Sequence, residues 1–498
     1  MRLPGLIAAL LACAAVAVGC NGDDGSSGPL ESSLAYVPSS TPFVVAIDTD
    51  VEGDQIQALD DILGRFPSGD SVARMLQEQI EQGADGVAYE DDVRPLLGNP
   101  FVVSATDPAS FVSDSDEEDF VAAIKVDDTG ALDSLIEKTG AREDGEVAGA
   151  TLYQDDGTTF AVEDDMVVFA ASRDLLETSL ERADGDDHLD LETFERSLEG
   201  LPGEGLARVY VDLQALIRQE AGGEAAQQVD WVGALRTLGM TATAEDDALE
   251  VEFNLRTASE GLSEEDLPLA AGDEAAQVVR IPGEVGFGLR DPSRLIGFFE
   301  SAFQTLDPQG FGDYETGKRA ISQRYDIDVD EDLFGQLTGD LSVSAAVNGA
   351  FGARAEVEDP DAFSRTVDRL ADALPELGEG LGVNDVVPRG DLYEARLADG
   401  GRFFFGVLDG VFVAGSDAAR ARAMASEQPE DVSGASGSLV MAADAEEVAL
   451  AVIRQVAPEL GLGGLFGGGL FARPLDELNG SVTTSTDGMR GSVRLTLD

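Results

Sequence analysis

Side chains that could act as nucleophiles, general bases or metal ligands are scarce in this chain of 498 residues. The sequence holds two cysteines, Cys13 and Cys20, and a single histidine, His188. His188 lies in the acidic stretch Asp184–Asp190, and the chain has no Gly-x-Ser-x-Gly elbow to present a serine nucleophile. One histidine also excludes zinc sites built on two or more of them. These features predict a solvated loop histidine and no Ser-His-Asp triad.

The chemistry that the sequence indicates most clearly is attachment of lipid to Cys20. Arg2 precedes an apolar run, Leu6–Val18, which is shorter than the roughly 20 residues of a membrane span and is typical of a signal peptide. The run ends in Ala17-Val18-Gly19-Cys20, which resembles the lipobox, where small residues precede a cysteine that is acylated and becomes the new N-terminus. We expect residues 1–19 to be a lipoprotein signal peptide. The alternative is an ordinary secretory signal with an incidental cysteine.

Acyl chains on Cys20 would anchor the protein, since each buried CH₂ contributes about 0.8 kcal/mol. Residues 20–31 are polar and rich in glycine and serine, which predicts a flexible tether. The expected location is extracytoplasmic, on the outer face of the cell membrane. Loss of Cys13 with the signal and acylation of Cys20 would leave no thiol for a disulfide, a nucleophile or a metal site.

Four aspartates alternate with other residues in one short stretch: Asp326, Asp328, Asp330 and Asp332. In a strand they would share one face. As a calcium loop the stretch lacks the glycine at the sixth position and the glutamate at the twelfth. We expect a solvated strand edge or loop, with a weak cation site as the alternative. No other metal site and no cofactor is predicted.

Two further patterns resemble a nucleotide-binding or a hydrolytic site. Gly312–Arg319 is close to a phosphate-binding loop but has Arg319 where the magnesium-binding Ser or Thr belongs. Paired carboxylates of a glycoside-hydrolase type are compatible with so many acids, but no pair stands out. An acid-pair hydrolase is therefore kept only as an alternative, and the chain is not expected to be an enzyme.

An uncharged, glycine-rich stretch, 460–472, carries five large apolar residues. It is either a loop that folds back on its own core or an exposed loop that touches a membrane or lines a ligand cavity. The residues of this candidate apolar contact loop are Leu462, Leu465, Phe466, Leu470 and Phe471.

The chain is strongly acidic, with 97 Asp and Glu against 32 Lys and Arg and a formal net charge of −65. Such a surface repels phosphate backbones, which excludes nucleic acid as a partner. A hydrophobic fraction of 43% argues against a disordered acidic tail. The acidity is expected from a GC-rich genome or from adaptation to salt, with attraction of divalent cations as the functional alternative.

The elements that would position these residues occur twice, at an offset of roughly 230–245 residues. Leu97–Ala105 matches Leu337–Ala345, and Phe120–Leu132 matches Phe351–Phe363. Each half closes on a strand of period two, at Leu249–Arg256 in the first. Asp-Gly turns between apolar runs indicate hairpins, and helical spacing at Leu132, Leu135 and Ile136 indicates flanking helices.

These signals predict an α+β fold: a tandem duplication of one unit whose mainly antiparallel sheet, a hairpin meander, is flanked by helices. The expected repeats are residues 32–257 and 269–498, joined by an acidic linker, 258–268.

The start of the first repeat, Leu34–Asp48, contains Tyr36-Val37-Pro38 before a predicted strand. It resembles the opening of the actinobacterial proteins grouped as domain-of-unknown-function family 3352. The resemblance implies a bacterial envelope protein and implies no activity.

Three functions remain open. The first is a non-catalytic envelope lipoprotein that binds another envelope protein or a wall component, or has a structural role. The second is a carrier or sensor of an apolar ligand held between sheet and helices. The third is the acid-pair hydrolase.

Overall fold

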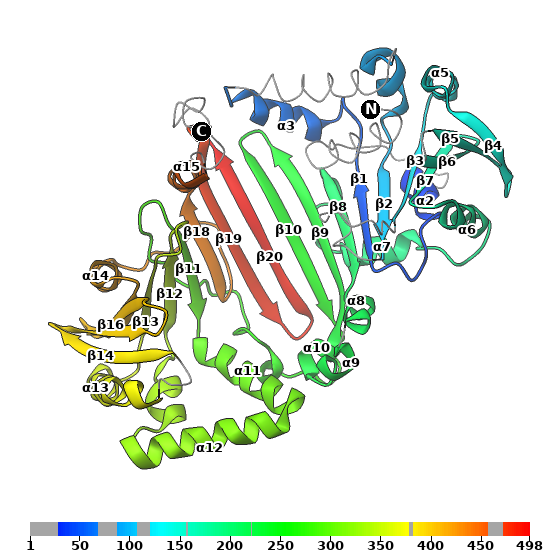
Figure 1. Cartoon of the computed structure of the whole chain (residues 1–498). Coiled ribbons are helices and arrows are strands. Elements are labelled where there is room, and N and C mark those ends of the chain that lie inside the picture. The colour runs from blue at the N-terminus through cyan, green and yellow to red at the C-terminus, as the bar shows by residue number, and fades with distance from the viewer. Residues whose placement is uncertain are drawn as a thin grey trace. The chain divides into compact units, whose positions relative to one another are not determined.

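The computed structural model describes residues 28–67, 87–106, 120–155, 158–220, 222–377, 382–456 and 472–498 (Figure 1). The chain forms two compact units, of residues 1–223 with 235–256 and of residues 224–234 with 257–498. The division at residue 256 lies beside the predicted linker. The assignment of 224–234 to the second unit is not apparent in the sequence. A hydrogen bond of 2.8 Å from Ala258 N to Ala234 O joins the end of this segment to the second unit.

The described part of the first unit is built on ten antiparallel strands in the order β10-β9-β8-β1-β2-β3-β7-β6-β5-β4. The strands are β1 (Phe43–Ile47), β2 (Phe101–Ala105), β3 (Phe120–Lys125), β4 (Arg142–Val147), β5 (Ala150–Asp155), β6 (Thr158–Glu163), β7 (Met166–Ala170), β8 (Ala207–Asp212), β9 (Leu235–Glu245) and β10 (Ala248–Thr257). The helical segments are α2 (Pro29–Leu34), α3 (Asp54–Gly64), η1 (Tyr89–Val93), η2 (Arg94–Leu96), α5 (Thr129–Thr139), α6 (Arg173–Ala183), α7 (Leu191–Ser197) and α8 (Leu213–Gln219).

Local sequence accounts for the ends of these elements. Asp128 caps α5 by accepting a hydrogen bond from Ala131 N, and Gly140 ends the helix in the left-handed region with φ 74°. Asp164 opens the two-residue turn between β6 and β7 with φ 50°, a conformation that hairpin turns require. The predicted helix around Leu132 and Leu135 is confirmed as α5, and both side chains are buried.

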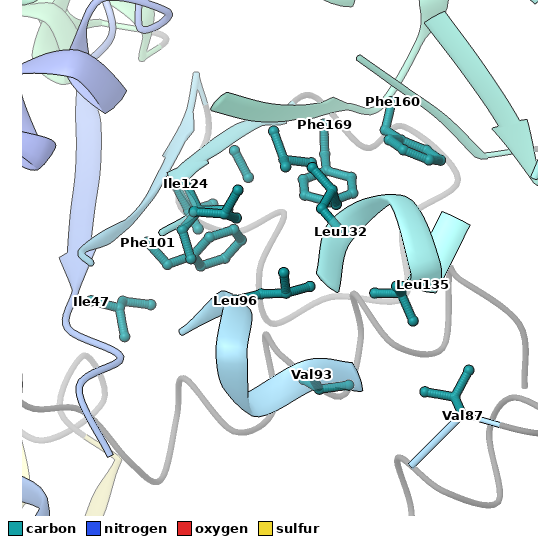
Figure 2. Close-up of a cluster of buried hydrophobic side chains, with 14 residues drawn as sticks. Ile47, Val87, Val93, Leu96, Phe101, Ile124, Leu132, Leu135, Phe160 and Phe169 are labelled. Carbon is teal, nitrogen blue, oxygen red and sulfur yellow. The ribbon is translucent and has the colours of Figure 1, made fainter. Parts of the chain in front are cut away.

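Helices cover both faces of the β3–β7 part of this sheet. On one face α5, η1 and η2 enclose an aromatic and aliphatic core, in which Leu132 lies beside Phe169 and Leu135 lies on the side of the helix toward Leu96 and Val93 (Figure 2). Phe160 stacks on Tyr153 there, with ring centroids 5.3 Å apart. On the other face, α6 packs on β7 and β3 in a second cluster. A third cluster joins α2 and α7 to β1 and β2 around Phe194, which is fully buried.

The second unit has ten described strands in the order β20-β19-β18-β11-β12-β13-β17-β16-β15-β14. They are β11 (Val285–Arg290), β12 (Asp340–Ala345), β13 (Phe351–Glu356), β14 (Val383–Arg389), β15 (Leu392–Leu397), β16 (Arg402–Leu408), β17 (Val411–Gly415), β18 (Leu439–Asp444), β19 (Leu475–Ser485) and β20 (Gly488–Leu497). The helical segments are α9 (Gly223–Ala226), at the division between the units, α10 (Asp230–Ala234), η4 (Glu264–Asp266), α11 (Pro292–Leu306), α12 (Pro308–Tyr325), η5 (Val329–Leu333), η6 (Phe334–Gln336), α13 (Pro360–Leu377), α14 (Ala418–Ser426) and α15 (Ala445–Val456).

The two strand orders correspond one to one when β1 is matched with β11, β2 with β12, and so on to β10 with β20. The predicted α+β class with a mainly antiparallel sheet is confirmed. The tandem duplication stays a prediction, which this common order supports. In the second unit α13 and α14 cover opposite faces of the β13–β17 part of the sheet (Figure 1).

Two expectations need correction. The flexible tether was predicted to extend to residue 31, but α2 begins at Pro29 and its Leu30 is only 8% exposed. The strand β10 forms as predicted, but its apolar residues are not turned uniformly to the core. Val251 is 37% exposed, whereas Asn254 is 4% exposed and donates a hydrogen bond from Nδ2 to Glu199 O. Polar groups bonded to backbone are buried at little cost, so alternation alone does not identify the covered face.

Candidate functional site

The strand β11 alternates glycine with apolar residues in Val285-Gly286-Phe287-Gly288-Leu289. The two glycines lie on one face of the sheet because side chains alternate along a strand. A Cβ at Gly286 would lie 2.5 Å from Val278 Cγ1, and one at Gly288 would lie 2.5 Å from Gln277 O. The segment around Val278 therefore packs directly on this face and closes it, and Val278 itself is fully buried.

On the opposite face of the same strands, the described part of the chain leaves apolar surface exposed. Phe287 lies there and is 37% exposed. It pairs directly with Val343 on β12 and with Met441 on β18. Met441 in turn pairs with Gly480 on β19, and Gly480 with Val493 on β20, which is 40% exposed. Residues paired in this way point to the same face, so these five residues form a continuous line across five strands, which we call the apolar row.

The residues beside the apolar row on this face are also uncharged and carry no hydrogen-bonding side chain. We call the whole set the open face. It consists of Val285, Phe287 and Leu289 on β11, Leu341, Val343 and Ala345 on β12, Leu439 and Met441 on β18, Leu478, Gly480 and Val482 on β19, and Gly491, Val493 and Leu495 on β20. Ala443 on β18 points the same way but is only 2% exposed, so the face is covered at that end.

Burial on these strands differs from the usual pattern, although Val440 on the closed face is fully buried with Val278 and Ala442. The closed face holds small or polar residues that are almost fully buried, including Ser342 at 2% exposure and Ser344 at 0%. The buried hydroxyl of Ser342 is satisfied, because its Oγ accepts a hydrogen bond from Val279 N at 2.7 Å. The large apolar side chains lie on the open side instead. Phe287 and Val493 are the large side chains of this face that are more than a third exposed. Leaving apolar area in water forgoes about 25 cal/mol per Å², which makes this face a candidate contact surface.

The first unit does not share this exposure. Val103 on β2, which corresponds to β12, is 2% exposed and belongs to the same core cluster as Phe101 and Phe169. The helix that follows the first strand differs in the same way. In the first unit α3 buries four side chains, among them Ile62 at 2% exposure. In the second unit α11 buries only Pro292, and Phe299 on it is 60% exposed.

Lys318 on α12 forms ion pairs with acidic residues of α11, α12 and η5. Its Nζ lies 3.1 Å from a Glu300 carboxylate oxygen, 2.6 Å from one of Glu315 and 2.9 Å from one of Asp330. It also lies 4.8 Å from the centre of the Tyr314 ring. Burial lowers the pKa of Lys318, but the hydrogen bonds to these carboxylates raise it by more, so the net pKa is well above its usual range. The near-match to a phosphate loop thus lies in a helix, with its lysine already paired.

The four alternating aspartates do not gather as one set of ligands, although Asp326 and Asp332 both pair with Arg369, at 3.2 and 3.7 Å. Asp326 ends α12 in the left-handed region with φ 56°, and Asp328 caps the π-helical turn η5. Asp326 pairs with Arg369 at 3.2 Å, and Asp330 pairs with Lys318. The strand geometry in which they would share a face is therefore not formed, because the αL residue turns the chain into a helical turn. In the described residues, no three acidic, histidine or cysteine side chains are grouped as ligands of a metal ion.

The other predicted residues divide into two sets. Cys20 and the apolar contact loop residues Leu462, Leu465, Phe466, Leu470 and Phe471 lie outside the residues that the structure describes. His188 is in an irregular segment, as predicted, with its ring Nδ1 3.0 Å from Gly185 O.

Several buried carboxylates are members of ion pairs. Asp92 is 3% exposed and accepts hydrogen bonds from Lys138 Nζ and from Ala88 N, which hold its pKa below the usual range. Glu394 accepts from both Arg389 and Arg396, which also lower its pKa. A carboxylate held in its charged form by a fixed cation is unsuited to act as a general acid, so these residues do not support the acid-pair hydrolase.

The open face was not foreseen from the sequence. The available signal was the alternation of glycine with apolar residues in β11, since glycine in a strand interior marks a close approach of other backbone. That signal indicates that the glycine face is closely covered. Any exposed apolar surface on this strand must then lie on the side that carries Phe287.

The chain was compared with curated proteins, with solved structures and with models of protein families. No curated protein matches the sequence. Crystal form III of TP0453 is 12% identical, covering 49% of this chain and 88% of that chain, with a TM-score of 0.26. Crystal form I of TP0453 is 14% identical, covering 45% and 78%, with a TM-score of 0.26. Likeness at this level carries no argument about the present chain.

None of the helices that the structure describes has the length and apolar composition needed to cross a membrane. The model of the family described as "Protein of unknown function (DUF3352)" matches residues 4–374, well over half of the sequence. The chain therefore belongs to the DUF3352 family of proteins of unknown function.

Proposed function

We propose that this protein is a non-catalytic, lipid-anchored envelope protein that binds an apolar ligand on the open face of its second unit. The observation that carries the proposal is the exposure of large apolar side chains, Phe287 and Val493 foremost, on a sheet whose opposite face is closed. An apolar ligand laid on the row would remove this surface from water, which is favourable in proportion to the area buried.

Charge supports the same choice. The open face has no charged residue although the chain carries a formal net charge of −65. The charged residues of β20, Arg490 and Arg494, occupy positions that alternate with the open face and so lie on its other side. A surface kept free of charge in so acidic a chain favours an apolar ligand over a wall component or a protein partner recognised by ion pairs.

The envelope location depends on Cys20 and its predicted acylation. Attachment near a membrane would place the open face within reach of lipids. A binding role also needs no nucleophile or general base, which agrees with the single histidine and the paired carboxylates.

The test is a titration with the neutral apolar fluorophore N-phenyl-1-naphthylamine. The protein is the chain without its predicted signal peptide and with Cys20→Ser, so that no acyl group competes. We expect saturable binding at one site, weakened at least tenfold by Val493→Asp, because a charge would be placed against the ligand. Val452→Asp on α15 is the matched control, since Val452 is 41% and Val493 is 40% exposed. Absence of saturable binding, or equal loss in both variants, would refute the proposed function.

A further inference from the structure

The chemistry of the open face narrows the class of ligand. We infer that it takes a hydrocarbon chain of a lipid with an uncharged headgroup, extended across the strands along the apolar row. This inference rests on the proposed function and adds the ligand's class, length and direction.

The backbone of the open face has no free edge to offer a peptide. Each of the three central strands is paired on both sides: β11 with β12 and β18, β18 with β11 and β19, and β19 with β18 and β20. Their amide and carbonyl groups are thus used within the sheet, and a peptide could not bind there by adding a strand.

The side chains of the apolar row likewise offer no hydrogen bond. Val343, Phe287, Met441, Gly480 and Val493 have neither a donor nor a strong acceptor. A peptide lying on the row would lose hydrogen bonds to water without replacing them, at about 1–3 kcal/mol for each buried unpaired group. A hydrocarbon chain has no such groups to lose, so the row discriminates between the two by chemistry alone.

The length of the row matches a lipid chain. From Val343 to Val493 the row crosses four gaps between neighbouring strands. At about 4.8 Å per gap this distance is about 19 Å. The hydrocarbon core of a bilayer is about 30 Å thick, so one leaflet accommodates chains of about 15 Å. The row can therefore contact one such chain over its whole length.

Charge determines the headgroup. The open face is uncharged, but it belongs to a protein with a formal net charge of −65. An anionic headgroup held near this protein is repelled by its overall field. The expected ligand therefore has an uncharged headgroup, and binding of the hydrocarbon chain itself should depend little on salt.

The experiment uses n-alkyl-β-D-maltosides with chains of 8 to 16 carbons, below their critical micelle concentrations, to displace N-phenyl-1-naphthylamine. We expect affinity to rise about fourfold for each added methylene, the change that corresponds to about 0.8 kcal/mol per buried CH₂. The rise should level off once the chain exceeds the length of the row. Val493→Asp should abolish the dependence on chain length, and Val452→Asp should preserve it.

The outcomes separate this inference from the proposed function. If the fluorophore binds at the open face but affinity does not change with chain length, or an uncharged apolar peptide displaces it equally well, the proposed function stands and the hydrocarbon chain is refuted. If light scattering shows a dimer that Val493→Asp dissociates, the occupant is a second copy and the inference also fails. If the fluorophore itself does not bind, both proposals fall.

Discussion

Replacement of Asp48 by asparagine should stabilise the protein, and only at neutral and alkaline pH. Asp48 follows β1, is 9% exposed, and accepts a hydrogen bond from Asp50 N at 3.0 Å. Burial raises its pKa from 3.8 to about 6, although the hydrogen bond from Asp50 opposes the shift. Asparagine keeps an oxygen to accept that hydrogen bond and removes the charge that burial penalises.

The sign and the magnitude follow from linkage. The folded state binds a proton at Asp48 more tightly than the unfolded state, so the free energy of unfolding falls as pH rises from about 4 through about 6. The interval between 3.8 and about 6 corresponds to about 3 kcal/mol, at about 1.36 kcal/mol per unit. Asp48→Asn should therefore gain up to about 3 kcal/mol at pH 8 and close to nothing below pH 4.

Urea unfolding followed by circular dichroism at pH 4, 6 and 8 measures this gain. Asp246→Asn, at an exposed turn of the same unit, controls for the change in net charge. A gain of the same size at pH 4 and pH 8 would show that the carboxylate's charge is not the cause. A loss of stability at pH 8 would show that Asp48 is stabilising in its charged form, contrary to the argument from burial.

Two further changes test ion pairs. Lys138→Met removes the cation from buried Asp92, whose pKa is lowered. It should lower the free energy of unfolding by about 3–5 kcal/mol at pH 7, and this loss should shrink as the pH falls below 4. Lys125→Met, at a more exposed ion pair, should cost under about 1 kcal/mol. Unfolding curves that show equal losses for both would contradict this. Lys318→Met should leave the carboxylates around it without a cation and weaken the contact between α11 and α12. Amide hydrogen exchange should then become faster in these two helices and stay unchanged in α5. Unchanged exchange in α11 and α12 would show that Lys318 does not hold them together.

Much of the secondary structure could be predicted because its signals are local. Period two in Leu249–Arg256 identified a strand, and helical spacing at Leu132 and Leu135 identified α5. The aspartates at 326–332 would share one face only in a strand, and whether a strand forms there depends on the tertiary structure, because the left-handed conformation of Asp326 follows from where the long helix α12 ends. Lipidation of Cys20 is a signal in sequence alone and stays a prediction.

Composition and periodicity were enough to predict the class of fold, the scarcity of catalytic groups and the acidity of the chain. Which face of a strand is covered became apparent from the packing of the folded chain. The alternation in β11 is the same whether Phe287 or the glycines face the core. Exposure of Phe287 depends on the preceding segment around Val278, which packs on the glycine side and is held there by hydrogen bonds between the backbones of Val278 and the distant Glu430. Burial is a property of neighbours brought together by folding, and the sequence of one strand does not contain them.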